Sequence, residues 1–158
     1  MTAESAQAWL AQNAPDLEVI DAHASTATVL EAAITLGVEP GRIAKTLAIR
    51  LRDEVVLLVT RGDARLDNGK TKLAFGARPR MLGADETQAL TGHPVGGVCP
   101  FGLAHPLPVY LDVSLKDYDE VFPAAGSRNS SVRAPTLRLA EILGSRWVDI
   151  CSISDATR

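Results

Sequence analysis

Two strand-like segments around a short polar turn dominate the middle of this sequence. Residues 46–52 and 55–60 are rich in Leu, Ile, Val and Thr, and Arg52-Asp53-Glu54 separates them, a pattern typical of a β-hairpin. Short helices with glycine at their ends are predicted on both sides, over residues 28–36, 66–75, 84–90 and 136–143. Further strands are predicted at residues 17–21, 107–113, 119–122 and 147–151. Because no regular strand–helix–strand repeat appears, we predict an α+β fold with a mixed or antiparallel sheet.

Length and composition indicate one globular domain over residues 1–158. Of these residues, 46% are hydrophobic and 22% are charged, which excludes a disordered chain. The longest apolar runs, such as Val55–Val59, are too short for a membrane span, and the first residues lack a basic signal sequence, so we expect a cytoplasmic protein without a membrane partner. The two cysteines and three histidines form no metal-ligand spacing, so no metal or other cofactor is predicted.

Charge is distributed unevenly along the chain. Residues 42–80 carry ten Lys or Arg and four acidic residues, a net charge of +6, whereas the remainder carries −9. Such a basic segment suits a polyanionic partner, although a solvated strand face explains it about equally well. Aromatic residues make up only 4% of the chain, which argues against a base-stacking platform.

One loop, residues 92–102, combines four glycines with two prolines. Glycine allows close approach of another molecule and proline restricts the backbone, so a rigid loop of this kind can direct amide groups at an oxyanion or a phosphate. A simple reversal of the chain before the predicted strand at Leu107 would need the same residues. Cys99 within the loop, and His93 and His105 at its flanks, are weaker candidates for a nucleophile and for general bases.

Lys45 is the second feature that indicates chemistry. It lies at the start of an apolar strand, beside Ala44 and Leu47, where a charge is unfavourable unless the side chain has a role. A lysine at the end of a strand can reach into a cleft to hold an anion or polarise a carbonyl. For any single lysine, reaching to solvent is the commoner outcome. Asp112, on a later strand, is a further candidate for facing such a cleft.

These features together resemble the YbaK/EbsC family. The resemblance rests on Lys45-Thr46-Leu47 at the head of a strand and on the loop Gly96–Gly102 about fifty residues later, and it covers roughly residues 27–143. The turn Pro123–Gly126 and the closing segment Ala140–Leu143 follow in the family's order. Members are free-standing aminoacyl-tRNA deacylases related to the editing domain of bacterial prolyl-tRNA synthetases.

The resemblance implies a fold, a reaction and a set of site residues. The implied fold is a mixed, partly barrel-like sheet surrounded by short helices. The implied reaction is hydrolysis of the ester on the 3′ end of a misacylated tRNA, without metal, other cofactor or covalent nucleophile, and with Lys45 required for it. Substrate-binding positions would be Thr46, Gly96, Gly97, Val98, Cys99, Pro100, Phe101 and Gly126. Contacts to the tRNA, and not to DNA, would come from Arg50, Arg52, Lys70 and Lys72.

Departures from the family pattern limit the specificity that can be inferred. The alanine-removing branch has a His after the position of Phe122 and an Asn after the lysine, where this chain has Pro123 and Thr46. The cysteine-removing branch has a different glycine-rich segment at residues 126–131. From the apolar residues of the loop we expect a small, uncharged amino acid, with tRNA-Pro as one possible carrier.

Two other functions stay open at this point. A non-catalytic module could recognise an aminoacyl-tRNA or a nucleotide in partnership with a tRNA synthetase. A hydrolase of a small ester unrelated to tRNA would use the same lysine and loop. An intact Lys45 together with the glycine loop favours an enzyme over the binding module, because a binding module would more readily have lost the lysine.

Overall fold

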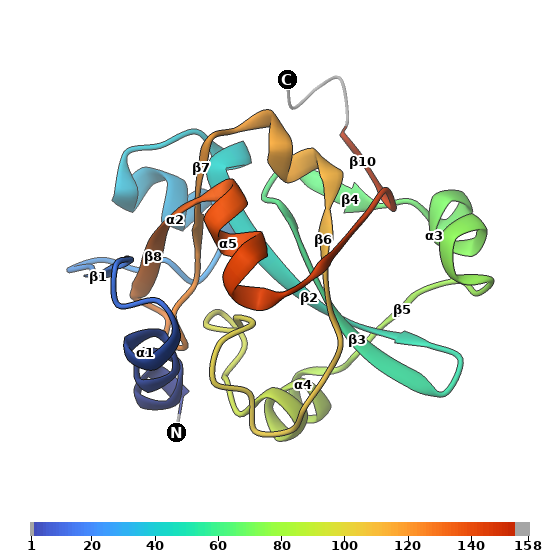
Figure 1. Cartoon of the computed structure of the whole chain (residues 1–158), viewed down its shortest axis with the longest axis horizontal. Coiled ribbons are helices and arrows are strands. Elements are labelled where there is room, and N and C mark those ends of the chain that lie inside the picture. The colour runs from blue at the N-terminus through green and yellow to red at the C-terminus, as the bar shows by residue number, and fades with distance from the viewer. Residues whose placement is uncertain (1, 154–158) are drawn as a thin grey trace.

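The computed structural model describes residues 2–153, and its helices surround a mixed sheet (Figure 1). Over this range the five α-helices are α1 (Thr2–Asn13), α2 (Val29–Leu36), α3 (Asn68–Phe75), α4 (Ala84–Thr91) and α5 (Thr136–Leu143). The 3-10 helices are η1 (Pro40–Arg42) and η2 (Val113–Asp117). The strands are β1 (Glu18–Asp21), β2 (Ile43–Leu51), β3 (Glu54–Arg61), β4 (Ala64–Leu66), β5 (Arg80–Met81), β6 (Val109–Asp112), β7 (Glu120–Pro123), β8 (Ser130–Pro135), β9 (Arg146–Val148) and β10 (Cys151–Ile153).

The main sheet confirms the predicted α+β class. Its strand order is β1-β8-β7-β2-β3-β6-β9, with β5 paired to β2, and a separate small sheet joins β4 to β10. The pairs β2–β7, β3–β6 and β6–β9 are parallel and the others antiparallel, so the sheet is mixed. Over the described residues its path runs from β1 to β9 without closing into a barrel.

The central hairpin forms as the sequence predicts. Strands β2 and β3 pair from Ala44–Arg61 to Leu51–Glu54, and Arg52 in the turn adopts a left-handed φ of 58°. Two-residue hairpin turns need positive φ because their twist must match that of the strands. Figure 1 shows β2 running through the middle of the molecule, with α5 in front of it, α2 on one side and α3 on the other.

Three apolar clusters hold these elements together. The largest packs α1 and α5 against the sheet through residues such as Leu10, Leu111 and Leu139. The second lies between the β2–β3 hairpin and the β4–β10 sheet, and the third packs α2 against β2 and β7. The third cluster is small, and in it α2 packs near Ile43 and Phe122.

The chain departs from the predicted elements at several places: β4, β5 and β8 were not predicted, and two of the predicted elements have other bounds. Leu66 belongs to β4, and the helix after it begins only at Asn68 because the Asp67 carboxylate caps it by accepting from the Lys70 amide at 2.9 Å. The single strand predicted at residues 147–151 is broken into β9 and β10. The cause is Ile150, whose amide donates to the buried Asp112 carboxylate at 2.9 Å instead of to a neighbouring strand.

Candidate functional site

A cavity of about 400 Å³ opens between α2, the first half of β2, the start of α4 and the glycine-rich loop. Lys45 and Thr46 from β2 lie in its wall, as do Val95, Gly96 and Val98 from the loop. Its size is typical of a pocket for a small ligand. The two features that the sequence analysis singled out, the lysine and the loop, are therefore brought together around one space.

Helix α2 supplies one wall of the cavity through Val29 and Ala32. Its first turn is capped because the Thr28 hydroxyl accepts from the Glu31 amide at 3.1 Å. At the other end Gly37 ends the helix in the left-handed conformation, with φ of 69°. The helix agrees with the one predicted over residues 28–36 with a glycine at its end, and its two caps determine which residues of this short helix reach the cavity.

Lys45 is half-buried, and its ammonium group does not point to solvent. Its Nζ donates a short hydrogen bond to the carbonyl oxygen of Ala64, the first residue of β4. Burial lowers the pKa of Lys45 from its usual value, while the negative charge of Asp63 acts in the opposite direction. Lys45 is thus a partly desolvated cation beside the cavity, which strengthens its interaction with any anion that enters.

The loop lines the cavity with Val95, Gly96 and Val98, and it packs against a neighbouring turn through Gly97. Gly97 is buried, and its amide donates to the Pro94 carbonyl at 2.9 Å, so this amide is engaged within the loop. A Cβ on Gly97 would lie 2.7 Å from the amide nitrogen of Ser127 and 2.9 Å from the carbonyl carbon of Gly126. Gly97 and Gly126 therefore allow loop and turn to pack closely, and neither belongs to the cavity wall.

Three loop residues predicted to bind substrate lie behind the cavity. Cys99, Pro100 and Phe101 are buried, and the side chains of Cys99 and Phe101 join the largest apolar cluster. The structure therefore corrects the predicted apolar wall, because among the loop residues named for it only Val98 faces the space. Burial also raises the pKa of the Cys99 thiol to about 12, so it is neutral near pH 7 and unsuited to nucleophilic attack.

His93 and Asp112 have structural roles instead of the catalytic ones considered for them. The His93 Nε2 donates to the Phe101 carbonyl at 2.7 Å and thereby closes the base of the loop, and burial lowers the pKa of this imidazole. Asp112 is buried and accepts from the amides of Ser114, at 3.0 Å, and Ile150. Neither side chain lies in the wall of the cavity.

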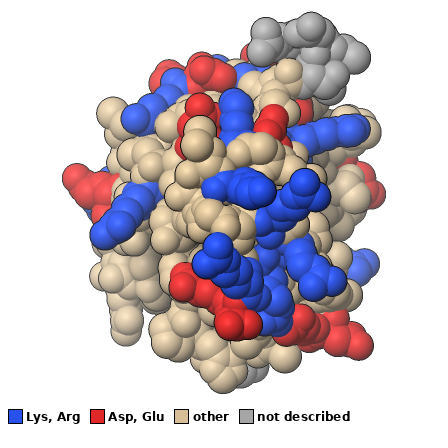
Figure 2. Space-filling view, turned by 90° about the vertical axis from the view of Figure 1, so that its right-hand side faces the viewer, with Lys and Arg blue, Asp and Glu red and all other residues tan. Residues whose placement is uncertain are grey.

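The four residues predicted to contact tRNA lie on one side of the molecule, outside the cavity. Figure 2 shows Lys and Arg side chains gathered on the face that contains α3, β5 and the end of the β2–β3 hairpin. On that face Arg50 forms an ion pair with Glu86. Arg52 donates to the Gly76 carbonyl at 2.7 Å and so caps the end of α3.

The other two members of this set differ in how they are held. Lys70 donates to the Asp149 carboxylate at 3.1 Å and to the Cys151 carbonyl at 2.9 Å, and the first of these contacts raises its pKa. Lys72 is exposed on α3, and no contact is recorded for it among the described side chains. Lys72 is therefore the member of the set with the most freedom to meet an external anion.

Three residues near the cavity were not predicted from the sequence. Thr26 and Met81 lie in its wall, from the segment before α2 and from β5. Arg128, in the turn before β8, is exposed, and its Nε donates to the Val95 carbonyl at 3.2 Å at the edge of the cavity. These positions come from three distant segments, and no local pattern marks them.

Within residues 2–153, no three His, Cys, Asp or Glu side chains gather as a metal site would require. None of the helices in this range is both long and apolar enough to cross a bilayer. The site is thus formed by one lysine, a rigid loop and the wall of α2, on a mixed α+β sheet.

Comparison with known proteins identifies this arrangement. The family model of the aminoacyl-tRNA editing domain matches residues 23–142, and the chain belongs to that family. YwhH of Bacillus subtilis, an uncharacterized protein, is 46% identical over 153 residues, which are 96% of this chain and 98% of YwhH. EbsC of Enterococcus faecalis, provisionally named a Cys-tRNA(Pro)/Cys-tRNA(Cys) deacylase, is 29% identical over 81% of this chain and 77% of its own.

Solved structures and synthetases agree with this assignment. A crystal structure described as a candidate trans-editing enzyme for prolyl-tRNA synthetase has a TM-score of 0.86 and 35% identity, and covers 95% of this chain and 96% of its own. The proline–tRNA ligase of Caldicellulosiruptor bescii is 26% identical over 80% of this chain, which corresponds to 22% of the ligase. The predicted relation to the YbaK/EbsC deacylases and to prolyl-tRNA synthetase editing domains is confirmed.

Proposed function

We propose that this protein is a trans-editing hydrolase that cleaves the ester between a small, uncharged amino acid and the 3′-terminal ribose of a tRNA, with tRNA-Pro as the first candidate. The observation that carries the proposal is a cavity of about 400 Å³ with Lys45 in its wall, in a chain of the aminoacyl-tRNA editing family. The names of EbsC and of the similar crystal structure support the choice of tRNA-Pro.

Lys45 has the central role in the proposed reaction. Its ammonium binds the terminal ribose or phosphate and stabilises the negative charge that develops as water adds to the ester carbonyl. In this proposal the amides of Gly96 and Val98, two loop residues that line the cavity, hold the amino-acid end or the oxyanion. The reaction needs neither a metal nor a covalent enzyme intermediate, and the 2′-hydroxyl of the substrate assists the attacking water.

Cavity size and wall explain the proposed specificity. Val29, Ala32 and Val98 give an apolar wall that accepts alanine, serine or cysteine. Such a wall discriminates poorly among small side chains, because one methylene changes kcat/KM by only about 10- to 200-fold. Larger side chains are excluded more sharply, because the loop is held by its contact with the turn at Ser127 and cannot move aside.

Contacts outside the cavity would bind the rest of the tRNA. In this proposal Arg128, at the edge of the cavity, contacts the last phosphodiester, and the exposed Lys72 on α3 contacts the acceptor stem. Lys72→Glu is expected to weaken tRNA binding and to lower the slope of log affinity against log salt by about one, without changing hydrolysis of a minimal aminoacyl-nucleotide. Lys116→Glu, an exposed site that does not line the cavity, is the matched control.

The decisive experiment measures ester loss from a panel of tRNAs, each charged with one amino acid, in the presence of EDTA. Alanyl, seryl or cysteinyl esters should be hydrolysed and phenylalanyl or aspartyl esters spared. Lys45→Ala should reduce the rate by about 10²–10³-fold, and Lys116→Ala should leave it unchanged. Wild-type turnover by Lys45→Ala would refute the mechanism. Binding of aminoacyl-tRNA without turnover would favour the non-catalytic module that works with a synthetase.

A further inference from the structure

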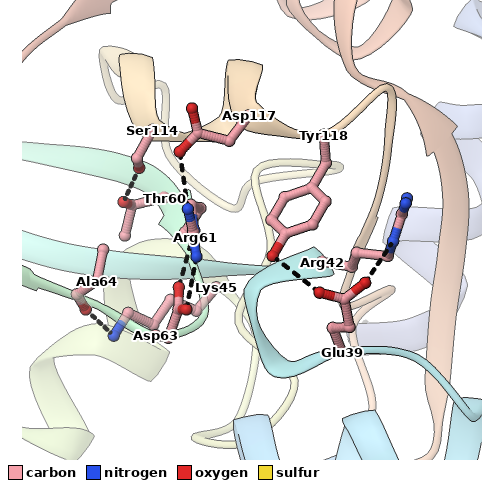
Figure 3. A network of polar contacts seen from close by, with 10 residues as sticks. All are labelled: Glu39, Arg42, Lys45, Thr60, Arg61, Asp63, Ala64, Ser114, Asp117 and Tyr118. Atoms are coloured by element: carbon pink, nitrogen blue, oxygen red, sulfur yellow. Dashed lines mark hydrogen bonds and ion pairs between the residues drawn. The ribbon is translucent and has the colours of Figure 1, made fainter. Parts of the chain in front are cut away.

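A dense ion-pair network lies at the end of β3, immediately beside Lys45 (Figure 3). Arg61 donates from Nε to one oxygen of Asp63 at 2.8 Å and from Nη2 to the other oxygen at 2.6 Å. Its Nη1 donates to Asp117 at 2.7 Å. The side chains of Arg61 and Asp63 are only 12% and 9% exposed, so this fork on the carboxylate is largely shielded from water.

The strand that follows the turn at Gly62 and Asp63 supplies the partner of Lys45. The ammonium of Lys45 donates to the carbonyl of Ala64, the residue after Asp63. Gly62, the residue before it, has no room for a side chain, because a Cβ there would lie 2.4 Å from the Pro40 carbonyl oxygen. The turn at Gly62 and Asp63 is therefore packed against η1 on one side and hydrogen-bonded to Arg61 on the other.

Few other charged or titratable groups act on this ammonium. They are Asp63, Arg65 of β4 and Cys151 of β10. Burial raises the pKa of the Cys151 thiol to about 12, so it is neutral near pH 7, and Arg65 is itself positive. Asp63 is thus the anion within reach that could compete with the Ala64 carbonyl, and with a substrate, for the ammonium of Lys45.

We propose that Arg61 is a positioning residue for Lys45: by occupying both oxygens of Asp63, it prevents this carboxylate from capturing the ammonium. Lys45 then keeps a neutral carbonyl partner, from which it can be recruited by a substrate anion. Without Arg61 the buried carboxylate would have an unsatisfied charge and would pair with Lys45. This inference rests on the role proposed above for Lys45.

A set of paired variants tests the inference on correctly folded protein. In Arg61→Met the kcat for deacylation should fall by about tenfold or more, and KM should rise, because the captured ammonium no longer binds the substrate anion. Asp63→Asn alone should stay close to wild type, and adding it to Arg61→Met should restore kcat to within about threefold, since the competing anion is gone. Asp117→Asn, which removes the other partner of Arg61 and leaves the fork on Asp63, is the matched control and should keep wild-type kcat.

A second readout does not depend on activity. The pKa of Lys45, followed by NMR titration of a labelled lysine side chain, should rise in Arg61→Met and fall again in the double variant. If Arg61→Met does not fold, Arg61→Lys replaces it, because an ammonium cannot occupy both carboxylate oxygens as a guanidinium does. Failure of the wild type to hydrolyse any ester would refute the proposed function. The inference on Arg61 would still be tested by comparing the Lys45 pKa in the wild type, in Arg61→Met and in the double variant.

Two results would overturn the inference. One is a double variant that is no more active than Arg61→Met although both are folded, since a purely structural role of Arg61 is not rescued by removing a charge. The other is wild-type kcat and wild-type Lys45 pKa in the single Arg61 variant.

Discussion

Replacement of Gly97 by alanine tests how the loop is held against the rest of the site. The added Cβ would lie 2.7 Å from the Ser127 amide nitrogen, with two further backbone atoms at 2.9 Å, whereas ordinary contacts begin at 3.4 Å. Loop and turn would have to separate by about 0.7 Å, and neither side is a flexible side chain that could give way. Overpacking of this kind costs about 1–3 kcal/mol of folding free energy.

The displacement should also reach the cavity, because Gly96 and Val98 flank Gly97 and line the cavity. A shift approaching 1 Å in a substrate-positioning group can reduce turnover by about 10²-fold. We therefore expect Gly97→Ala to lower both the free energy of unfolding, measured with urea, and kcat/KM for deacylation. The cause would be displacement and not loss of an oxyanion donor, since the Gly97 amide is already bonded to Pro94.

Gly83→Ala provides the control for this experiment. Gly83 has an ordinary φ of −70°, and a Cβ there would have no neighbour within 4 Å. Its replacement should change stability and kcat/KM only slightly. Wild-type stability together with wild-type kcat/KM in Gly97→Ala would refute the close packing of loop and turn on which the reasoning depends.

Three further predictions follow from single side chains. Burial lowers the pKa of His93, so this imidazole binds a proton more readily in the unfolded chain than in the folded one. The free energy of unfolding should therefore fall as the pH drops from about 7 to 5. Urea titrations of His93→Gln should show a flatter pH dependence. Cys99→Ser should retain most deacylation in the tRNA assay, because the thiol is buried behind the cavity, and complete loss would restore the nucleophile hypothesis. Thr28→Ala should lower the free energy of unfolding by about 1 kcal/mol, measured by chemical denaturation, because it removes the cap on the Glu31 amide. It should also raise KM, because α2 forms a wall of the cavity. An unchanged KM would contradict that role of α2.

Local sequence alone determined the regular elements around the site. The hairpin of β2 and β3 follows from two segments rich in Leu, Ile, Val and Thr on either side of a polar turn, and α2 follows from its cap residues Thr28 and Gly37. In both cases the hydrogen bonds that define the element join residues close in the sequence, so the pattern of nearby residues is sufficient. The pairing of Lys45 with the glycine loop came from the family resemblance, because no local rule connects residues fifty positions apart.

Tertiary structure alone decided which way the loop side chains face and what Lys45 contacts. In an irregular loop the direction of the side chains follows no regular period along the sequence. Packing against α1 and the sheet therefore decides that Phe101 faces inward and that Val98 lines the cavity. The partner of Lys45 is a carbonyl 19 residues later, at the start of β4, directly after a turn that is held by the fork between Arg61 and Asp63. Such contacts depend on the folded positions of several segments at once, and they are therefore absent from any local pattern of residues.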